Sequence, residues 1–199
     1  MGTLFTIGHS NHSLENFMKI LMDNNFHYVL DVRSNPHARF VPHFNEKQLS
    51  RYLNSINVNY ANIGKYFGAR QTQKEYYSQE GYLDFELFRE SDLFQIGLNT
   101  TLKLLENSNV LLLCMERDPI DCHRAIMVGR GFELSRIKVN HILFDSTIIT
   151  QDELNHRLLD KYFPARDQLS LFNNQEKDNE LLIKAYRNRN KEVGYYLKK

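Results

Sequence analysis

The stretch from Val110 to Arg124 most constrains the fold, because an apolar run changes abruptly there into a polar loop and then into a helical pattern. The run Val-Leu-Leu-Leu-Cys carries no polar residue, and a new helical periodicity begins near Cys122. A continuous apolar run of this length is typical of a strand that is buried on both faces of a parallel sheet. The sequence therefore predicts a buried strand, a polar loop and a helix start, and both cysteines of the chain fall in this segment.

The same order of a short apolar run, a polar turn and a helical period recurs along the chain. Strands are expected over 3–7 and 28–32, joined by a helix with Ser13 as its N-cap. Two strands joined in this way form a right-handed βαβ unit with parallel strands. We therefore predict an α/β fold, a single Rossmann-like domain with a mostly parallel sheet of about five strands flanked by helices. The other expected strands cover 58–63, 110–114 and 139–144, and the other helices 46–55, 84–106 with a break near Ser91, 122–135 and 150–162.

The domain is predicted to occupy residues 1–163, because Pro164 ends the last periodic helix. Residues 164–199 are predicted to form a C-terminal linker and a charged tail. The formal net charge of +1 does not by itself indicate a nucleic-acid-binding protein. No run approaches the roughly 20 apolar residues of a membrane helix, and residues 1–10 do not resemble a signal peptide. We therefore expect a cytoplasmic protein without a membrane partner.

Cys122, His123 and Arg124 lie at the start of a predicted helix, where free N–H groups and the helix dipole stabilise anions. A cysteine at this position can be held as a reactive thiolate. His123 and Arg124 are candidates for binding a phosphate or a carboxylate. Alternatively, Cys122 is only a helix-start residue, His123 lies on the surface, and Arg124 pairs with Glu116 or Asp31.

Glu116 follows the buried strand, and a carboxylate beside apolar residues can act as acid, base or nucleophile. Alternatively, it pairs with Arg117 or Arg124. Cys114, one position inside the strand, is expected in the core. The eight positions between the two cysteines match none of the usual short zinc spacings, so we expect no metal and no cofactor.

Two further strand ends bring polar residues to the same edge of the predicted sheet, where ligands of α/β folds bind. After the first strand, Gly8 allows close approach of a ligand, and Ser10 offers a hydroxyl. After the second, Arg33 and Ser34 are candidates for binding phosphate or sugar hydroxyls, although the two serines could equally be local caps. The predicted catalytic residues are Glu116, Cys122, Asp31 and His9, and the predicted phosphate- or substrate-binding residues are Gly8, Ser10, Arg33, Ser34, Arg39, His123 and Arg124.

Several of these motifs together resemble a known family. They are Gly8-His9-Ser10, Asp31-Val32-Arg33-Ser34-Asn35-Pro36, Arg39, Phe44-Asn45, Tyr60, Gly64, Gly68, and Cys114-Met115-Glu116 followed by Pro119 and Cys122-His123-Arg124. Their pattern is similar to that of the bacterial domain-of-unknown-function family numbered 488, over roughly residues 3 to 143. The resemblance implies a Rossmann-like α/β domain and implies little about activity. Gly68-Ala69-Arg70 departs from a family Gly-Gly-Arg at its second position.

The tail carries a separate motif, Gln168-Leu169-Ser170-Leu171-Phe172. It resembles the pentapeptide by which bacterial replication and repair proteins bind the sliding clamp. In such a peptide the two leucines and Phe172 fill a hydrophobic groove, and Gln168 fixes the register by hydrogen bonding. The sequence therefore predicts the sliding clamp as a partner. Alternatively, the segment packs its apolar side chains on the domain.

Local charge is compatible with DNA, because basic side chains with interleaved aromatic ones can follow a backbone and stack bases. Arg33, Arg39, Lys47 and Arg51 surround Glu46, and a basic, aromatic loop follows over residues 64–79. We predict a DNA-associated enzyme, recruited to replication or repair sites by the clamp, that acts on a nucleotide or a nucleic-acid base or backbone. The reaction is left open between a phosphate ester and an N-glycosidic bond. The alternatives are a non-catalytic nucleic-acid or nucleotide-binding adaptor and a small-molecule enzyme with no DNA role.

Overall fold

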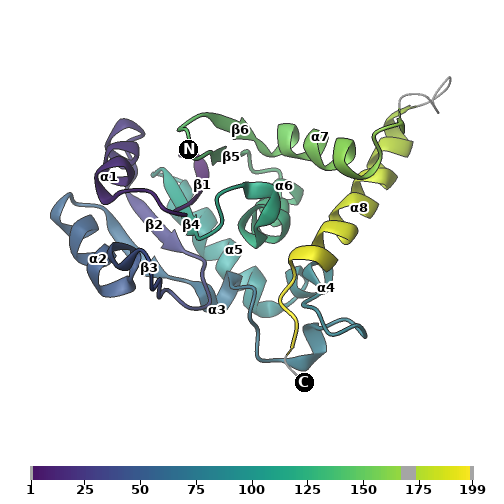
Figure 1. Cartoon of the computed structure of the whole chain (residues 1–199), viewed down its shortest axis with the longest axis horizontal. Coiled ribbons are helices and arrows are strands. Elements are labelled where there is room, and N and C mark those ends of the chain that lie inside the picture. The colour runs from purple at the N-terminus through teal and green to yellow at the C-terminus, as the bar shows by residue number, and fades with distance from the viewer. Residues whose placement is uncertain (1, 167–173, 198–199) are drawn as a thin grey trace.

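A six-stranded sheet forms the centre of the computed structural model, which describes residues 2–166 and 174–197 (Figure 1). The strand order is β3-β2-β4-β1-β5-β6, with β6 antiparallel to β5 and all other neighbours parallel. The predicted α/β fold with a mostly parallel sheet is confirmed. The edge strand β6 was not predicted, because its three residues are too few to show a period. The strands are β1 (Leu4–Gly8), β2 (Tyr28–Asp31), β3 (Asn59–Asn62), β4 (Val110–Cys114), β5 (Val139–Ile142) and β6 (Ile148–Thr150).

The helices begin and end largely where the sequence signals them. Ser13 caps α1 by accepting a hydrogen bond from the backbone of Asn16, and Ser91 separates α4 from α5 by capping the second. Thr150 and Glu153 form a reciprocal capping box at α7. The α-helices are α1 (Leu14–Asp23), α2 (Glu46–Ser55), α3 (Gly64–Phe67), α4 (Phe85–Arg89), α5 (Asp92–Leu105), α6 (Arg130–Leu134), α7 (Gln151–Tyr162) and α8 (Asn174–Val193). Shorter turns are the 3-10 helices η1 (Pro42–Phe44), η2 (Lys74–Tyr76) and η3 (Pro119–Asp121), and the π-helix η4 (Arg124–Gly129).

Strand β4 is fully buried because helices cover both faces of the sheet. Leu111 and Leu113 belong to a core that also contains side chains of α1 and α2, which lie together on one side of the sheet in Figure 1. Val110, Leu112 and Cys114 belong to a second core with side chains of α4, α5, η4 and α6. Alternation along the strand thus places Cys114 on the face that carries η4.

The described part of the charged tail packs on the domain. The side chains of Ala185, Tyr186 and Arg189 in α8 are buried. The hydroxyl of Tyr186 donates to Asn155 Oδ1 at 2.6 Å, and Arg189 Nε donates to the carbonyl of Ile120 at 2.8 Å. This packing was not predicted, because such long-range contacts leave no local pattern in a charged segment.

After α8 the chain runs on downward in Figure 1 and passes beside residues 81–83. The backbone N–H of Leu83 donates to the carbonyl of Tyr195 at 2.9 Å, and that of Leu197 donates to the carbonyl of Gly81 at 2.9 Å. The clamp-like pentapeptide at 168–172 lies outside the described residues. Among the residues that are described, no helix has both the length and the apolar character needed to cross a membrane.

Candidate functional site

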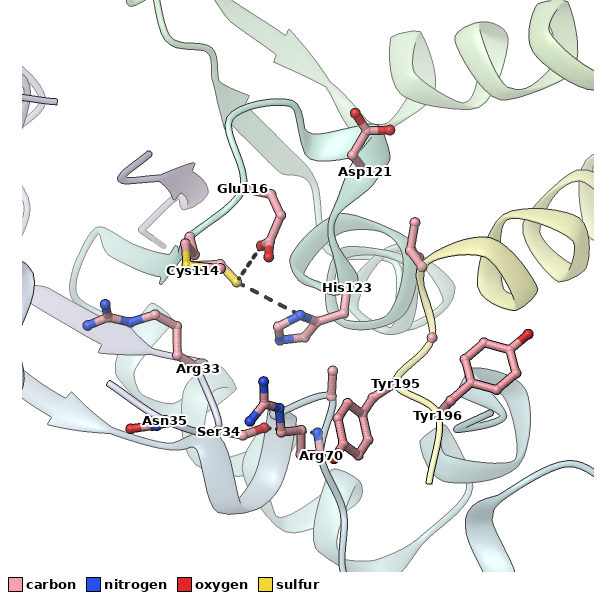
Figure 2. Close-up of a pocket in the computed structure, with 14 residues that line it drawn as sticks. Arg33, Ser34, Asn35, Arg70, Cys114, Glu116, Asp121, His123, Tyr195 and Tyr196 are labelled. Carbon is pink, nitrogen blue, oxygen red and sulfur yellow. Dashed lines mark hydrogen bonds between the residues drawn. The ribbon is translucent and has the colours of Figure 1, made fainter. Parts of the chain in front are cut away.

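A pocket of about 400 Å³ lies at the carboxyl ends of β2 and β4, where α/β folds bind ligands. Figure 2 shows side chains from distant parts of the chain around it. The lining residues are 33–35 after β2, 69–70 after α3, 114–116 with 121 and 123 around β4 and η3, and 193–196 at the end of α8 and just after it. The buried side chains of Cys114 and His123 form the floor, and the exposed side chains of Arg70 and Tyr196 lie at the mouth.

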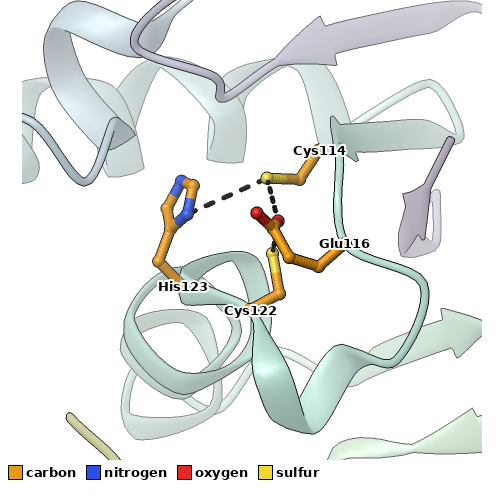
Figure 3. A group of neighbouring side chains, drawn as sticks. All are labelled: Cys114, Glu116, Cys122 and His123. Carbon is orange, nitrogen blue, oxygen red and sulfur yellow. Dashed lines mark hydrogen bonds between the residues drawn. The ribbon is translucent and has the colours of Figure 1, made fainter. Parts of the chain in front are cut away.

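Four polar side chains converge at the floor of this pocket: Cys114, Glu116, Cys122 and His123 (Figure 3). One donor atom from each lies within 4.8 Å of the other three. The thiols of Cys114 and Cys122 donate to Glu116 Oε2 at 3.2 and 2.8 Å, and Cys114 Sγ lies 3.8 Å from His123 Nδ1. The expectation of no metal rested on the separation of the two cysteines in the chain, whereas the fold brings all four groups together regardless of that separation.

The surroundings of these groups shift their proton affinities. Burial raises the pKa of the Cys114 thiol and of the Glu116 carboxyl, and the neighbouring Cys122 raises the pKa of Glu116 further. Burial also disfavours a Cys122 thiolate, but the Cys114 thiol, Arg124 and His123 outweigh it and lower the pKa of Cys122. Burial opposes protonation of His123, but Cys122 and Glu116 prevail and raise its pKa. The arrangement thus favours a Cys122 thiolate beside a His123 imidazolium.

The loop that carries Glu116 is held from behind by Arg124, whose side chain is fully buried. Its Nη1 donates to the carbonyl of Glu116 at 2.6 Å, and its Nη2 donates to that of Arg117 at 3.4 Å. Gly8 permits this packing, since a Cβ there would lie 1.6 Å from the Glu116 carbonyl oxygen. The sequence had predicted that Arg124 and Gly8 bind a phosphate or substrate. In the structure both residues support the loop, and neither lines the pocket.

His9, Asp31 and Arg33 form a buried network next to the pocket. Arg33 Nε donates to Asp31 Oδ1 at 2.8 Å, Arg33 Nη1 contacts His9 Nε2 at 2.9 Å, and the Tyr60 hydroxyl donates to Asp31 Oδ2 at 2.8 Å. Burial and the Arg33 charge lower the pKa of His9 to about 4. Of the three, only Arg33 lines the pocket, and its guanidinium is engaged by Asp31, His9 and the carbonyl of Phe44. The structure thus shows the polar groups of His9, Asp31 and Arg33 bonded to one another. The sequence had predicted catalytic roles for His9 and Asp31 and a substrate-binding role for Arg33.

The remaining predicted residues are placed in different surroundings. Ser34 lines the pocket, and its hydroxyl accepts a hydrogen bond from the backbone of Arg70 at 2.9 Å. Ser10, with a positive φ of 42°, donates its backbone N–H to the carbonyl of Met115 at 2.8 Å and does not line the pocket. Arg39 is exposed, lies beside Phe40 and does not line the pocket either.

Two side chains at the mouth were not predicted as site residues. The guanidinium of Arg70 lies over the ring of Tyr195, 4.9 Å from its centroid. Within the described residues, Arg70 forms no ion pair. Arg70 belongs to the basic, aromatic loop that the sequence shows, but the position of Tyr195 depends on the packing of α8. An ion pair between Arg189 and Asp121 contributes to that packing.

Comparison with the sequence models of protein families gives a match. The sequence model of the family described as "Domain of unknown function DUF488" matches residues 13–130, which is more than half of the chain. The match includes the residues around Cys114 and Cys122 and ends before β5. A search of curated proteins finds no match to the chain.

Proposed function

The chain belongs to this family, the domain of unknown function DUF488, and we propose that it is an enzyme that acts on a nucleotide, either free or within nucleic acid. One observation carries the proposal: the same pocket has an arginine and tyrosines at its mouth and a carboxyl, an imidazole and a thiol at its floor. A pocket that combines apolar walls with a few convergent polar groups is the usual form of a small-molecule site.

The groups at the mouth suit the two ends of a nucleotide. Arg70 has no carboxylate partner among the described residues, so its guanidinium is available to bind a phosphate in a bidentate pair. Arg70 covers one face of Tyr195, and the exposed ring of Tyr196 offers an aromatic face on which a base can stack. An anionic substrate with a planar ring would therefore bind between them.

The groups at the floor favour chemistry at the base or its glycosidic bond. Cys122 is buried and does not line the pocket, whereas Glu116 is partly exposed and does. A phosphate ester in the pocket would therefore have no direct access to the Cys122 thiol. Glu116 can reach a substrate and transfer a proton to or from it, so we assign Glu116 the catalytic role.

Turnover and binding together test this proposal. The purified chain is incubated with nucleosides, nucleotides and short single-stranded DNA, and released products are separated by chromatography and identified by mass. Glu116→Gln should abolish turnover and leave substrate binding within a few-fold of wild type. Arg70→Ala should raise KM about tenfold or more, since one charge-assisted hydrogen-bonded pair is lost. The matched variant Arg39→Ala should change neither kcat nor KM.

A non-catalytic adaptor would give a different result. Such a module would bind a nucleotide through Arg70 but would convert none of the substrates. Binding without turnover in the wild-type chain would therefore favour the adaptor, and absence of both binding and turnover would contradict a nucleotide site altogether.

We further propose that the pentapeptide at 168–172 recruits the enzyme to the bacterial sliding clamp. The support is the fit of five consecutive sequence positions to a peptide that fills an apolar groove. Calorimetry with purified clamp should detect binding to the wild-type chain and none to the double variant Leu171→Ala/Phe172→Ala. Equal binding of both chains would refute the assignment of this peptide.

A further inference from the structure

We infer that Cys114, Glu116, Cys122 and His123 form a binding site for a transition-metal ion with the ligand preferences of zinc. The inference concerns the floor of the pocket described above. It stands on the arrangement of donor atoms and does not depend on turnover of any substrate.

The separations between the donor atoms suit a tetrahedral ion. Zinc lies about 2.3 Å from sulfur and about 2.0–2.1 Å from nitrogen or oxygen, so the edges of its coordination tetrahedron measure roughly 3.3–3.8 Å. Glu116 Oε2 lies 3.2 Å from Cys114 Sγ and 2.8 Å from Cys122 Sγ, and Cys114 Sγ lies 3.8 Å from His123 Nδ1. One ligand atom from each of the four residues lies within 4.8 Å of the other three. Small side-chain movements would therefore place them around a central ion.

The orientation of His123 also suits a metal ligand. Its Nε2 lies 3.2 Å from the carbonyl oxygen of Val32, an acceptor, so this nitrogen keeps its proton when the imidazolium loses one to become the neutral ring that binds a metal. The lone pair is then on Nδ1, the nitrogen that faces the thiols. Metal-bound histidines commonly donate their second ring N–H to a backbone carbonyl in this way, which fixes both the tautomer and the ring.

The kinds of donor narrow the choice of ion. Two thiolates and an imidazole are ligands for zinc and related transition metals, whereas magnesium and calcium prefer oxygen. Cys114 and Cys122 are the only cysteines in the sequence, too few for the four that iron–sulfur clusters commonly use. Zinc is therefore the ion that the set fits best.

The position of the site in the pocket points to a reactive rather than a closed metal centre. Cys114, Glu116 and His123 line the pocket, and Cys122 lies behind them. Glu116 is the only partly exposed member, so it is the ligand that can give its position to water or substrate. The ion would then face a bound substrate as a Lewis acid, and this consequence alone rests on the proposed function.

Metal content and X-ray absorption of the wild-type chain test the inference without any variant. The full chain, purified without chelators and dialysed, should carry one zinc ion. Its absorption spectrum should show two sulfur neighbours at about 2.3 Å and nitrogen or oxygen neighbours at about 2.0–2.1 Å. A zinc shell with oxygen and nitrogen only, or a chain that takes up no zinc in titration, would overturn the inference.

Variants locate the ion. Cys114→Ser and Cys122→Ser should each weaken zinc affinity, measured by competition with a coloured chelator, by more than about 100-fold, since even outer-shell changes cost 10–100-fold. The matched control is His156→Gln, which removes an exposed histidine near Asp152 that could hold zinc adventitiously. Loss of zinc from the control with retention in both cysteine variants would refute the site. Circular dichroism confirms that each variant is folded.

These results are separable from those on activity. A chain that holds zinc on two sulfurs but converts no nucleotide would contradict the proposed function and leave the metal site intact. A chain that turns over substrate after its metal has been removed would support the proposed function and refute only the Lewis-acid role of the ion.

Discussion

Replacement of Asp31 by Asn should destabilise the protein strongly, because it removes the charge that compensates a buried arginine. The Asp31 side chain is fully buried, and Arg33 is 5% exposed. Asp31 accepts hydrogen bonds from the backbone N–H of Arg33 at 3.0 Å, from Arg33 Nε at 2.8 Å and from the Tyr60 hydroxyl at 2.8 Å. With a neutral amide in its place, the guanidinium stays in the core without a counter-ion.

Breaking one side of such a pair costs about 3–5 kcal/mol. Domains of this kind are stable by only about 5–15 kcal/mol, so the loss is a large fraction of the free energy of unfolding. Tyr60→Phe gives a scale for comparison, because it removes one hydrogen bond to the same carboxylate and should cost about 1.5 kcal/mol, the lower end for a bond to a charged group at a half-buried position.

Urea denaturation followed by circular dichroism at pH 7 measures both values. The pair Asp31→Leu/Arg33→Met should be less destabilised than Asp31→Leu alone, since the second change removes the unpaired charge. A loss below about 1 kcal/mol for Asp31→Asn, or a double variant worse than the single one, would refute the idea that Arg33 depends on Asp31.

Three further predictions concern the support of the pocket. Gly8→Ala should cost about 3 kcal/mol in unfolding free energy measured in urea, because its Cβ would lie 1.6 Å from the Glu116 carbonyl oxygen; a neutral effect would show that the loop yields easily. Tyr186→Phe should lower the free energy of unfolding by about 1–3 kcal/mol, since it removes the hydrogen bonds of the Tyr186 hydroxyl to buried Gln151 Nε2 and Asn155 Oδ1, and the matched change Tyr196→Phe at an exposed position should have little effect. Burial, and then the charge of Arg124, lower the pKa of His141 to about 3, so the folded state keeps this residue neutral while the unfolded state protonates it near pH 6.5. The neutral His141 therefore contributes fully to the free energy of unfolding above pH 6.5, and this contribution decreases as the pH falls toward 3, by about 2 kcal/mol between pH 7 and pH 5. His141→Gln should remove that part of the decrease in stability. An unchanged pH dependence in the variant would contradict this explanation.

The fold was predictable because its signals are local. The apolar run of β4 and the caps at Ser13 and Ser91 depend on neighbouring residues, and these signals place the strand and the helix starts correctly. The edge strand β6 and the short α3 lack such signals, since each has too few residues for a period.

The site was predictable only in part, because direction and distance are not local. The sequence correctly places Cys114 in the core, where its buried side chain also lines the pocket, but it predicts Arg124 at an anion site, whereas Arg124 is buried behind the loop. Both residues belong to segments that were located correctly, but the sequence does not show which face of a helix start is turned toward the core. The contribution of Tyr195 depends on a contact with Leu83, more than a hundred positions earlier in the chain.

The long reach of this contact also sets an order of assembly. The chain leaves the ribosome from its N-terminus, so residues 33–35, 69–70 and 114–123 are all available before the wall at 193–196 has been made. Until Arg189 bonds to the carbonyl of Ile120 and pairs with Asp121, that side of the pocket is open, and Cys114 and His123, which line the pocket, can be reached from it. A newly made chain therefore has an interval in which the floor of the pocket can be loaded or oxidised, and the docking of α8 ends that interval.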